Sequence, residues 1–374
     1  MDAALRGGLF SGGSAFNFFM SELSLSEQGW RMPAEWEPHA ATWMSWPSRK
    51  DTSFPEGDHH DRVLPVFLEM IRAITSSEPL YLNCTDPDDR AYVNANLDDE
   101  TKKNLVITDI PAVYPWCRDH GAIFVVNDEL RQVAATSWKY NAWGGKYPEA
   151  FPDNNISSAM ARVLGLPEFD AGLVLEGGSI DCNGCGTVLT TESCLLNPNR
   201  NPHLDRAGIE AHLNDWLGFE KVLWLHDGIV GDDTDGHIDD ITRFINAETV
   251  LTVIEEDETD VNHRPLEENY QRLCRMTTED GSPLNVITLP MPAPVIIDGE
   301  RLPASYANFY IANKVVLLPV FGDPRDSDAI AILSEAFPDR RIVPINSREL
   351  VWGLGSFHCL TQQVPAARGS VPLL

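Results

Sequence analysis

The chain has few basic residues for its length. Of its 374 residues, 28 are Lys or Arg and 56 are Asp or Glu, which gives a formal net charge of −28 and a pI near 4.6. Nucleic acids bind to cationic surfaces, so this balance argues against a nucleic-acid-binding protein. An acidic surface would instead raise the local concentration of a small cation, although an acidic host proteome explains the charge equally well.

Long apolar runs and a disulfide framework are also missing. No run reaches the length of about 20 residues that a transmembrane helix needs, and the seven cysteines are scattered and odd in number. We therefore expect a protein of the reducing cytoplasm. Residues 1–24 lack the cationic region and cleavage site of a signal peptide.

We expect residues 1–31 to form a disordered or weakly ordered tail. Alternatively, the true start of the protein is Met20 or Met32. No linker or low-complexity segment divides the remainder. Residues 32–374 are therefore predicted to form a single domain.

Common metal and nucleotide motifs are absent. The sequence has no H-E-x-x-H, Walker A or G-x-S-x-G motif. The acidic segment after Gly231 is similar to an EF-hand loop, but Gly231 and Thr242 occupy the first and twelfth ligand positions, so the calcium loop is incomplete. Cys182 and Cys185 lack a second pair at zinc spacing, so we expect them at a hairpin tip. These observations favour a metal-free site.

Apolar β-type runs recur along the chain at residues 123, 188, 250 and 315, at intervals of 65, 62 and 65. A shorter strand candidate precedes a run, and an amphipathic helix and a further strand follow it. We expect helices at 156–164, 204–217, 266–276 and 326–337, the last with Asp326 as its N-cap, and a similar unit near the start with a helix at 62–75. The pattern predicts an α/β fold of about five ββαβ units that close into a ring.

Polar residues gather just before the hairpins of successive units, in the segments 116–121, 175–181, 231–240 and 353–359. Taken singly, each segment has a structural explanation: an Asp119–Arg118 ion pair, a turn at Glu176 or a solvated acidic loop. Their recurrence at one point of the repeat predicts that they converge on the axis of the ring.

The last of these segments places Cys359 behind the glycine-rich turn Gly353-Leu354-Gly355. A single cysteine is more often a small buried hydrophobic residue than a catalyst. A thiolate, however, is a strong nucleophile, and Asp119, Glu176 and Asp239 would suit a planar guanidinium better than a neutral amide. The residues therefore predict attack by a thiolate on a guanidinium carbon.

Five sequence blocks stand out along the chain: Met32–His39, Trp116–Gly121, Leu175–Ser179, Asp235–Asp239 and Phe357–Gln363. They resemble the signature motifs of the agmatine deiminase family, in the guanidine-modifying or pentein superfamily, and the resemblance runs from about residue 32 to residue 365. It implies a five-bladed α/β propeller of ββαβ units with pseudo-fivefold symmetry and no metal or organic cofactor. It also implies hydrolysis of agmatine to N-carbamoylputrescine and ammonia, a step of polyamine (putrescine) biosynthesis.

The resemblance also implies residue roles. Cys359 corresponds to the nucleophile, His237 to the general acid and base, and Glu176 to the carboxylate that orients the histidine and the guanidinium. Asp119 and Asp239 correspond to the pair that grips the guanidinium nitrogens. The partner is then a small cationic guanidine, with no nucleic acid or membrane, and a homo-oligomer is compatible with the sequence.

The residues that contact the substrate tail are less defined. Trp116 is a candidate for the tail pocket, whereas Trp143 is assigned to the core. Ser356, Phe357 and His120 depart from the common family pattern, and Ser356 and Phe357 are expected to reshape the wall beside the nucleophile. The alternatives are a deiminase of peptidyl or free arginine, an amidinotransferase and a non-catalytic guanidine- or polyamine-binding protein.

Overall fold

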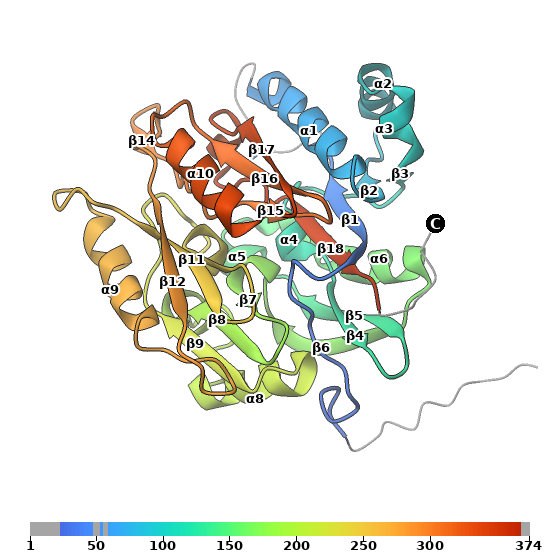
Figure 1. Cartoon of the computed structure of the whole chain (residues 1–374). Coiled ribbons are helices and arrows are strands. Elements are labelled where there is room, and N and C mark those ends of the chain that lie inside the picture. The colour runs from blue at the N-terminus through green and yellow to red at the C-terminus, as the bar shows by residue number, and fades with distance from the viewer. Residues whose placement is uncertain (1–22, 48–52, 55–58, 368–374) are drawn as a thin grey trace, which may run out of the picture.

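Small mixed sheets dominate the computed structural model, which describes residues 23–47, 53–54 and 59–367 (Figure 1). Within these ranges, five sheets have three or four strands, and β13 (Ile296–Ile297) and β14 (Glu300–Arg301) form a separate hairpin. The protein is therefore a mixed α/β protein. The described helices include none with the length and apolar character of a membrane span.

Four of the sheets share one topology. In each, two strands pair antiparallel and a third strand then pairs parallel with the second. In sheet order, the strands are β4 (Ile123–Asn127), β5 (Gln132–Lys139) and β6 (Glu168–Val174); β7 (Asp181–Cys182), β8 (Thr187–Thr191) and β9 (Lys221–Leu225); β10 (Thr242–Phe244), β11 (Thr249–Ile254) and β12 (Asn285–Pro290); and β15 (Tyr310–Ile311), β16 (Val315–Val320) and β17 (Arg341–Asn346).

A helix connects the two parallel strands of each of these sheets, as a parallel connection requires. The helices bury residues spaced three or four apart, such as Leu266, Asn269 and Leu273 in α9, and the two leucines join the same apolar cluster as Leu251 of β11. Figure 1 shows α8 and α9 at the outside of the molecule. The four helices are α6 (Ile156–Leu164), α8 (Arg206–Leu217), α9 (His263–Leu273) and α10 (Asp326–Ala336).

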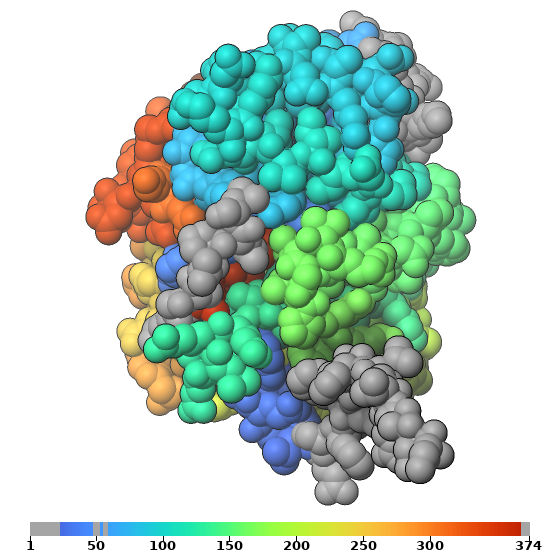
Figure 2. Space-filling view, turned by 90° about the vertical axis from the view of Figure 1, so that its right-hand side faces the viewer, coloured from blue at the N-terminus to red at the C-terminus, as the bar shows by residue number. Residues whose placement is uncertain are grey.

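The fifth sheet contains the first and the last described strands of the chain. The C-terminal strand β18 (Thr361–Pro365) pairs antiparallel with β1 (His39–Ser45), and β2 (Leu80–Asn83) and β3 (Leu105–Thr108) continue the sheet in parallel. Helix α1 (His59–Thr75) joins β1 to β2, and α2 (Pro87–Asn96) and α3 (Asp99–Lys103) are inserted before β3. Strand β18 is buried along its length, and little of the deep red C-terminal end is visible in Figure 2.

Short helical turns precede the first strands of three sheets. They are α4 (Cys117–His120) before β4, η2 (Gly177–Ser179) before β7 and η3 (Ile238–Asp240) before β10. Asn308 and Cys359 stand at the same point before β15 and β18. Turn α4 contacts η2 and β18, and η2 contacts η3, so these starting points lie together in space.

The structure corrects the phase of the predicted repeat. The runs at 188, 250 and 315 lie in second strands (β8, β11 and β16), but the run at 123 is β4, a first strand. The interval of 65 residues from 123 to 188 therefore compares non-equivalent strands. Both strands of the β4–β5 hairpin contain consecutive buried residues, so apolar content alone does not distinguish the first from the second.

Two further boundaries differ from the predictions. Helix α10 begins at Asp326, and Arg325 is its N-cap residue, because the Asp326 carboxylate accepts hydrogen bonds from Phe321 and Gly322 of the preceding loop. Residues 23–31 do not belong to a weakly ordered tail: Leu25 and Trp30 are buried in an apolar cluster. Residues 1–22, which make up the rest of the predicted tail, lie outside the described residues.

Candidate active site

The turn before β18 presents Cys359 to a cavity of about 510 Å³. This turn follows η4 (Leu350–Gly353), and Gly355 lies directly under the Trp116 ring. A Cβ atom on Gly355 would lie 2.6 Å from the Trp116 ring, so glycine is required for this close approach. The Cys359 side chain is 6% exposed. It is therefore largely withdrawn from solvent but faces the cavity.

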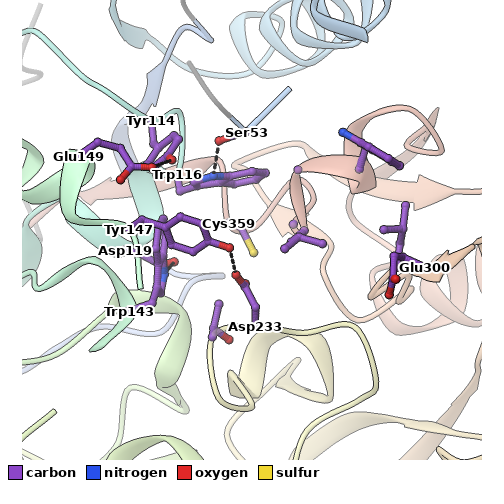
Figure 3. A pocket seen from close by; sticks show the side chains of 16 residues that line it. Ser53, Tyr114, Trp116, Asp119, Trp143, Tyr147, Glu149, Asp233, Glu300 and Cys359 are labelled. Atoms are coloured by element: carbon purple, nitrogen blue, oxygen red, sulfur yellow. Dashed lines mark hydrogen bonds between the residues drawn. The ribbon is translucent and has the colours of Figure 1, made fainter. Parts of the chain in front are cut away.

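Aromatic and acidic side chains form most of the cavity wall (Figure 3). The Cys359 sulfur lies at the centre of this view, with Asp119 and Tyr147 on one side and Glu300 on the other. Tyr147 donates a hydrogen bond to Asp233, and Tyr114 donates one to Glu149 at 2.8 Å. The aromatic members of the wall are Tyr114, Trp116, Trp143, Tyr147 and Trp352, and the acidic members are Asp119, Glu149, Asp233 and Glu300.

Two buried aspartates lie close to the sulfur. Asp119, on α4, accepts hydrogen bonds from the Gly178 amide at 3.1 Å and from the Trp143 indole at 2.9 Å. Asp239, on η3, lies with its Oδ2 atom 3.5 Å from the Cys359 Sγ atom. A Cβ atom on Gly178 would lie within 3.0 Å of Asp119, Asp239 and His237. Glycine at this position therefore allows the three side chains to converge.

His237 and Glu176 lie behind this pair. The Nδ1 atom of His237 is 3.7 Å from Oδ1 of Asp119. Burial alone would lower the pKa of His237, but the neighbouring Asp119 and the Cys194 thiol, together with Asp239, hold its pKa well above the usual value. Glu176 is completely buried, and its Oε1 atom accepts a hydrogen bond from Arg200 at 2.7 Å.

Two of these carboxylates, each bound by a neighbouring side chain, retain one oxygen without a hydrogen bond. Arg200 holds Oε1 of Glu176 and leaves Oε2 unpaired, and His358 holds Oδ2 of Asp239 at 2.7 Å and leaves Oδ1 unpaired. Unpaired buried oxygens are costly, and in an active site they indicate where a ligand donates. Several N–H donors on a planar cation would satisfy this arrangement.

The carboxylates also determine the protonation of the thiol. Burial, followed by the nearby charges of Asp239, Asp240 and Asp119, raises the pKa of Cys359 well above its usual value. Burial raises the pKa of Asp119 to about 6, opposed by His237. In the absence of a cationic ligand, the thiol is therefore favoured over the thiolate.

One group of side chains could hold a metal ion. Ligand atoms of Glu176, Cys194 and His237 lie within 4.8 Å of one another. Arg200 already occupies one oxygen of Glu176, and burial raises the pKa of the Cys194 thiol, which disfavours the thiolate form that binds metals. This donor set fits a resident cation poorly.

The predicted site residues therefore lie in one region but in two layers. Cys359, Asp119 and Trp116 line the cavity, whereas His237, Glu176 and Asp239 are buried directly behind its wall. Trp143 lies in an apolar core cluster, as predicted, but it also lines the cavity, and its indole nitrogen donates a hydrogen bond to Asp119. Residues Ala142–Gly145 (α5) have positive φ angles, a left-handed backbone that the sequence does not reveal.

The expected effect of Ser356 and Phe357 on the cavity wall was also wrong. Phe357 is fully buried in an apolar cluster, and the Ser356 hydroxyl pairs with Ser347 at 2.7 Å. Neither residue lines the cavity, nor does His120, which bonds to the Tyr114 carbonyl. The three departures from the family pattern therefore lie outside the cavity wall. Ser356 and Phe357 support the turn that holds Cys359, and His120 binds the segment that precedes α4.

Several residues of the site escaped the sequence analysis. The Glu35 carboxylate lies within 3.1 Å of side-chain nitrogens of Arg118, Arg243 and His358. Because His358 also contacts Asp239, Glu35 helps to hold Asp239 in place. Asn308 contacts the Cys359 sulfur at 3.0 Å. Its place before the fourth hairpin, equivalent to Cys359 before β18, was the signal that could have identified it.

Comparisons with known proteins agree with this geometry. The chain matches the family profile of Porphyromonas-type peptidyl-arginine deiminases over residues 31–365. A Legionella pneumophila (strain Paris) protein named as a candidate agmatine deiminase is 38% identical over 340 residues, which are 91% of this chain and 96% of that protein.

Two solved structures are similar over nearly their whole length. An agmatine deiminase of Enterococcus faecalis is 33% identical with a TM-score of 0.85, covering 92% of this chain and 98% of that chain. A C. jejuni agmatine deiminase variant with substrate bound is 30% identical with a TM-score of 0.81, covering 90% and 96%. These matches confirm the resemblance seen in the sequence motifs: the chain belongs to the agmatine deiminase family, which the Porphyromonas-type peptidyl-arginine deiminase profile describes.

Proposed function

We propose that this protein hydrolyses the guanidinium group of agmatine to N-carbamoylputrescine and ammonia. The observation that carries the proposal is the position of the Cys359 thiol among buried carboxylates that retain unpaired oxygens. This arrangement suits a planar cation with a reactive central carbon. The agmatine deiminases among its relatives support the same substrate class.

The cavity wall favours a substrate with a cationic tail. Glu149, Asp233 and Glu300 line it, and its described lining residues include neither Lys nor Arg. A free arginine would bring its α-carboxylate close to these acidic side chains, whereas the ammonium group of agmatine would be attracted to them. A peptidyl arginine has amides in place of both groups and so gains no such attraction. Agmatine is therefore preferred over both.

The geometry supports the following residue roles. Glu176, Asp119 and Asp239 bind the guanidinium nitrogens, and the bound positive charge offsets the carboxylates that oppose thiolate formation at Cys359. The thiolate attacks the central carbon, protonated His237 gives a proton to the leaving nitrogen, and ammonia departs. Water then attacks the covalent thiouronium carbon, His237 accepts its proton, the C–S bond breaks and the ureido product is released. Trp116 packs against the Cys359 turn and flanks the substrate.

Ammonia release with agmatine, arginine and an arginyl peptide, assayed side by side, tests this function. We expect release from agmatine by the wild type, none by Cys359→Ala, and wild-type rates for Cys274→Ala, which changes an exposed thiol. Assays with and without EDTA test the Glu176–Cys194–His237 group, and we expect equal rates. Turnover by folded Cys359→Ala would exclude Cys359 as the nucleophile. Faster turnover of arginine than of agmatine would contradict the proposed preference for a cationic substrate tail.

At the level of architecture, we propose that the five larger sheets are blades of one pseudo-fivefold propeller and that residues 32–374 act as a single domain. The shared topology of the sheets and the contacts among the turns before their first strands support this arrangement. A reducing location such as the cytoplasm is supported by the seven cysteines, all unpaired in the described structure.

A further inference from the structure

Asn308 lies between the nucleophile and a buried carboxyl group. It precedes β15, and its side chain is 1% exposed. Its Nδ2 atom lies 3.0 Å from the Cys359 Sγ atom and 2.9 Å from Oδ1 of Asp240. The side chain therefore contacts the reacting sulfur directly.

The orientation of this amide is fixed by its other contacts. The Oδ1 atom of Asn308 accepts hydrogen bonds from the backbone N–H groups of His358 at 3.0 Å and Cys359 at 3.3 Å. A backbone N–H group can only donate, so the oxygen must face the backbone and the NH₂ group must face the sulfur. The Cys359 sulfur is consequently a hydrogen-bond acceptor at this contact.

We infer that Asn308 is a catalytic residue that stabilises the Cys359 thiolate by donating a hydrogen bond to its sulfur. Such a donor is needed because burial opposes a negative charge on this sulfur, as do the ionised forms of the carboxyl groups that face it, Asp239 and Asp240 on η3 and Asp119 on α4. The two backbone contacts fix the position of the donor before the substrate arrives. Its part in turnover rests on the proposed function, but its contact with the sulfur does not.

Asn308→Asp tests the donor with little change of shape. The carboxylate keeps an acceptor for the two backbone N–H groups but replaces the donor facing the sulfur with a negatively charged acceptor. We expect iodoacetamide to alkylate Cys359 about 10- to 100-fold more slowly at neutral pH, the range for a hydrogen bond to a charged group. Mass spectrometry of the Cys359 peptide measures this rate separately from the exposed cysteines. We expect kcat for agmatine to fall by a similar factor, with a smaller change in KM.

Asn183 offers a matched control in the turn between β7 and β8. Its Oδ1 atom also accepts from two backbone N–H groups, and its Nδ2 atom donates to Glu279, but it does not line the cavity. Asn183→Asp should lower the melting temperature without slowing the alkylation of Cys359. Asn308→Ala removes the donor without adding a charge, and should also slow alkylation if Asn308→Asp does not fold.

The outcomes separate this inference from the proposed function. A wild-type alkylation rate in a folded Asn308 variant would overturn the role of the amide. Slow alkylation of the variants, in a protein whose wild type releases no ammonia from agmatine, would support the role and refute the proposed function.

Discussion

The three buried carboxylates of the site differ in how their charge is compensated. Glu176 is paired with Arg200, and Asp239 with His358. Asp119 instead accepts hydrogen bonds from two neutral donors, and its nearest cationic partner is His237 at 3.7 Å. Burial therefore raises the pKa of Asp119 to about 6, which places its titration close to neutral pH.

We expect kcat/KM for agmatine to decrease about tenfold per pH unit below pH 6, because a protonated Asp119 no longer attracts the guanidinium cation. The pH dependence of kcat/KM reports groups of the free enzyme. Asp119→Asn should lower kcat/KM at pH 8 and remove this acidic limb. Asp99→Asn, at an exposed position of α3, serves as the control and should retain the wild-type profile. An unchanged limb in Asp119→Asn would assign the titration to another group.

The same pKa has a consequence for stability. Native Asp119 keeps its proton up to pH 6, whereas the unfolded chain loses it near pH 4. The native state therefore binds more protons between these values, and the contribution of Asp119 to the unfolding free energy falls as pH rises from about 4 to 6. Denaturant unfolding should show this fall in the wild type and not in Asp119→Asn.

At the scale of elements, short turns rather than long helices position the chemistry. Turns α4 and η3 carry Asp119 and Asp239, and Glu176 directly precedes η2. Each turn leads into the first strand of a different sheet. The side chains of these turns therefore lie within a few ångströms of one another although they are far apart in the sequence. Gly178 in η2 is the point of closest approach between these turns.

Gly178→Ala should reduce kcat/KM for agmatine by about 100-fold, because the new Cβ atom would displace His237, Asp119 and Asp239 from a common centre. Gly208→Ala in α8 is the control, since the new Cβ atom would lie 3.2 Å from the end of the flexible Leu204 side chain, which precedes the helix. Steady-state kinetics and thermal unfolding of both variants distinguish a loss of geometry from a loss of fold. Full activity of Gly178→Ala would show that the site tolerates this displacement.

At the scale of the whole molecule, the first and last described strands pair in one sheet, and the chain carries a net charge of −28. The β18–β1 pairing covers the edge of β1 and fixes the turn that holds Cys359. The excess negative charge attracts cationic solutes but repels itself in the compact state. Salt should therefore have opposite effects on substrate capture and on stability.

Raising NaCl from about 20 mM to about 500 mM should lower kcat/KM for agmatine several-fold and raise the melting temperature, since salt screens both the attraction and the self-repulsion. Alkylation of Cys359 by uncharged iodoacetamide controls for direct effects of salt on the site and should change little. A kcat/KM that is independent of salt would show that the surface charge does not contribute to substrate capture.

The local units and the chemical class of the site could be predicted from residue type and spacing alone. Apolar periodicity predicted the connecting helices, and the recurring polar segments identified Asp119, Glu176, His237 and Cys359 as neighbours. These features depend on spacing and residue type along the chain, which the sequence contains directly. The acidic composition agreed with a cationic ligand but agreed equally with an acidic host proteome.

Which side of each segment faces the cavity depends on the three-dimensional packing of the sheets and turns. A left-handed backbone turns Trp143 onto Asp119, whereas Phe357 points into the core although it lies two residues from Cys359. The contacts of Asn308 with Cys359 and of His358 with Glu35 join positions more than fifty residues apart. Such contacts depend on how the five sheets meet, because a single altered turn redirects a side chain while the sequence pattern around it stays the same.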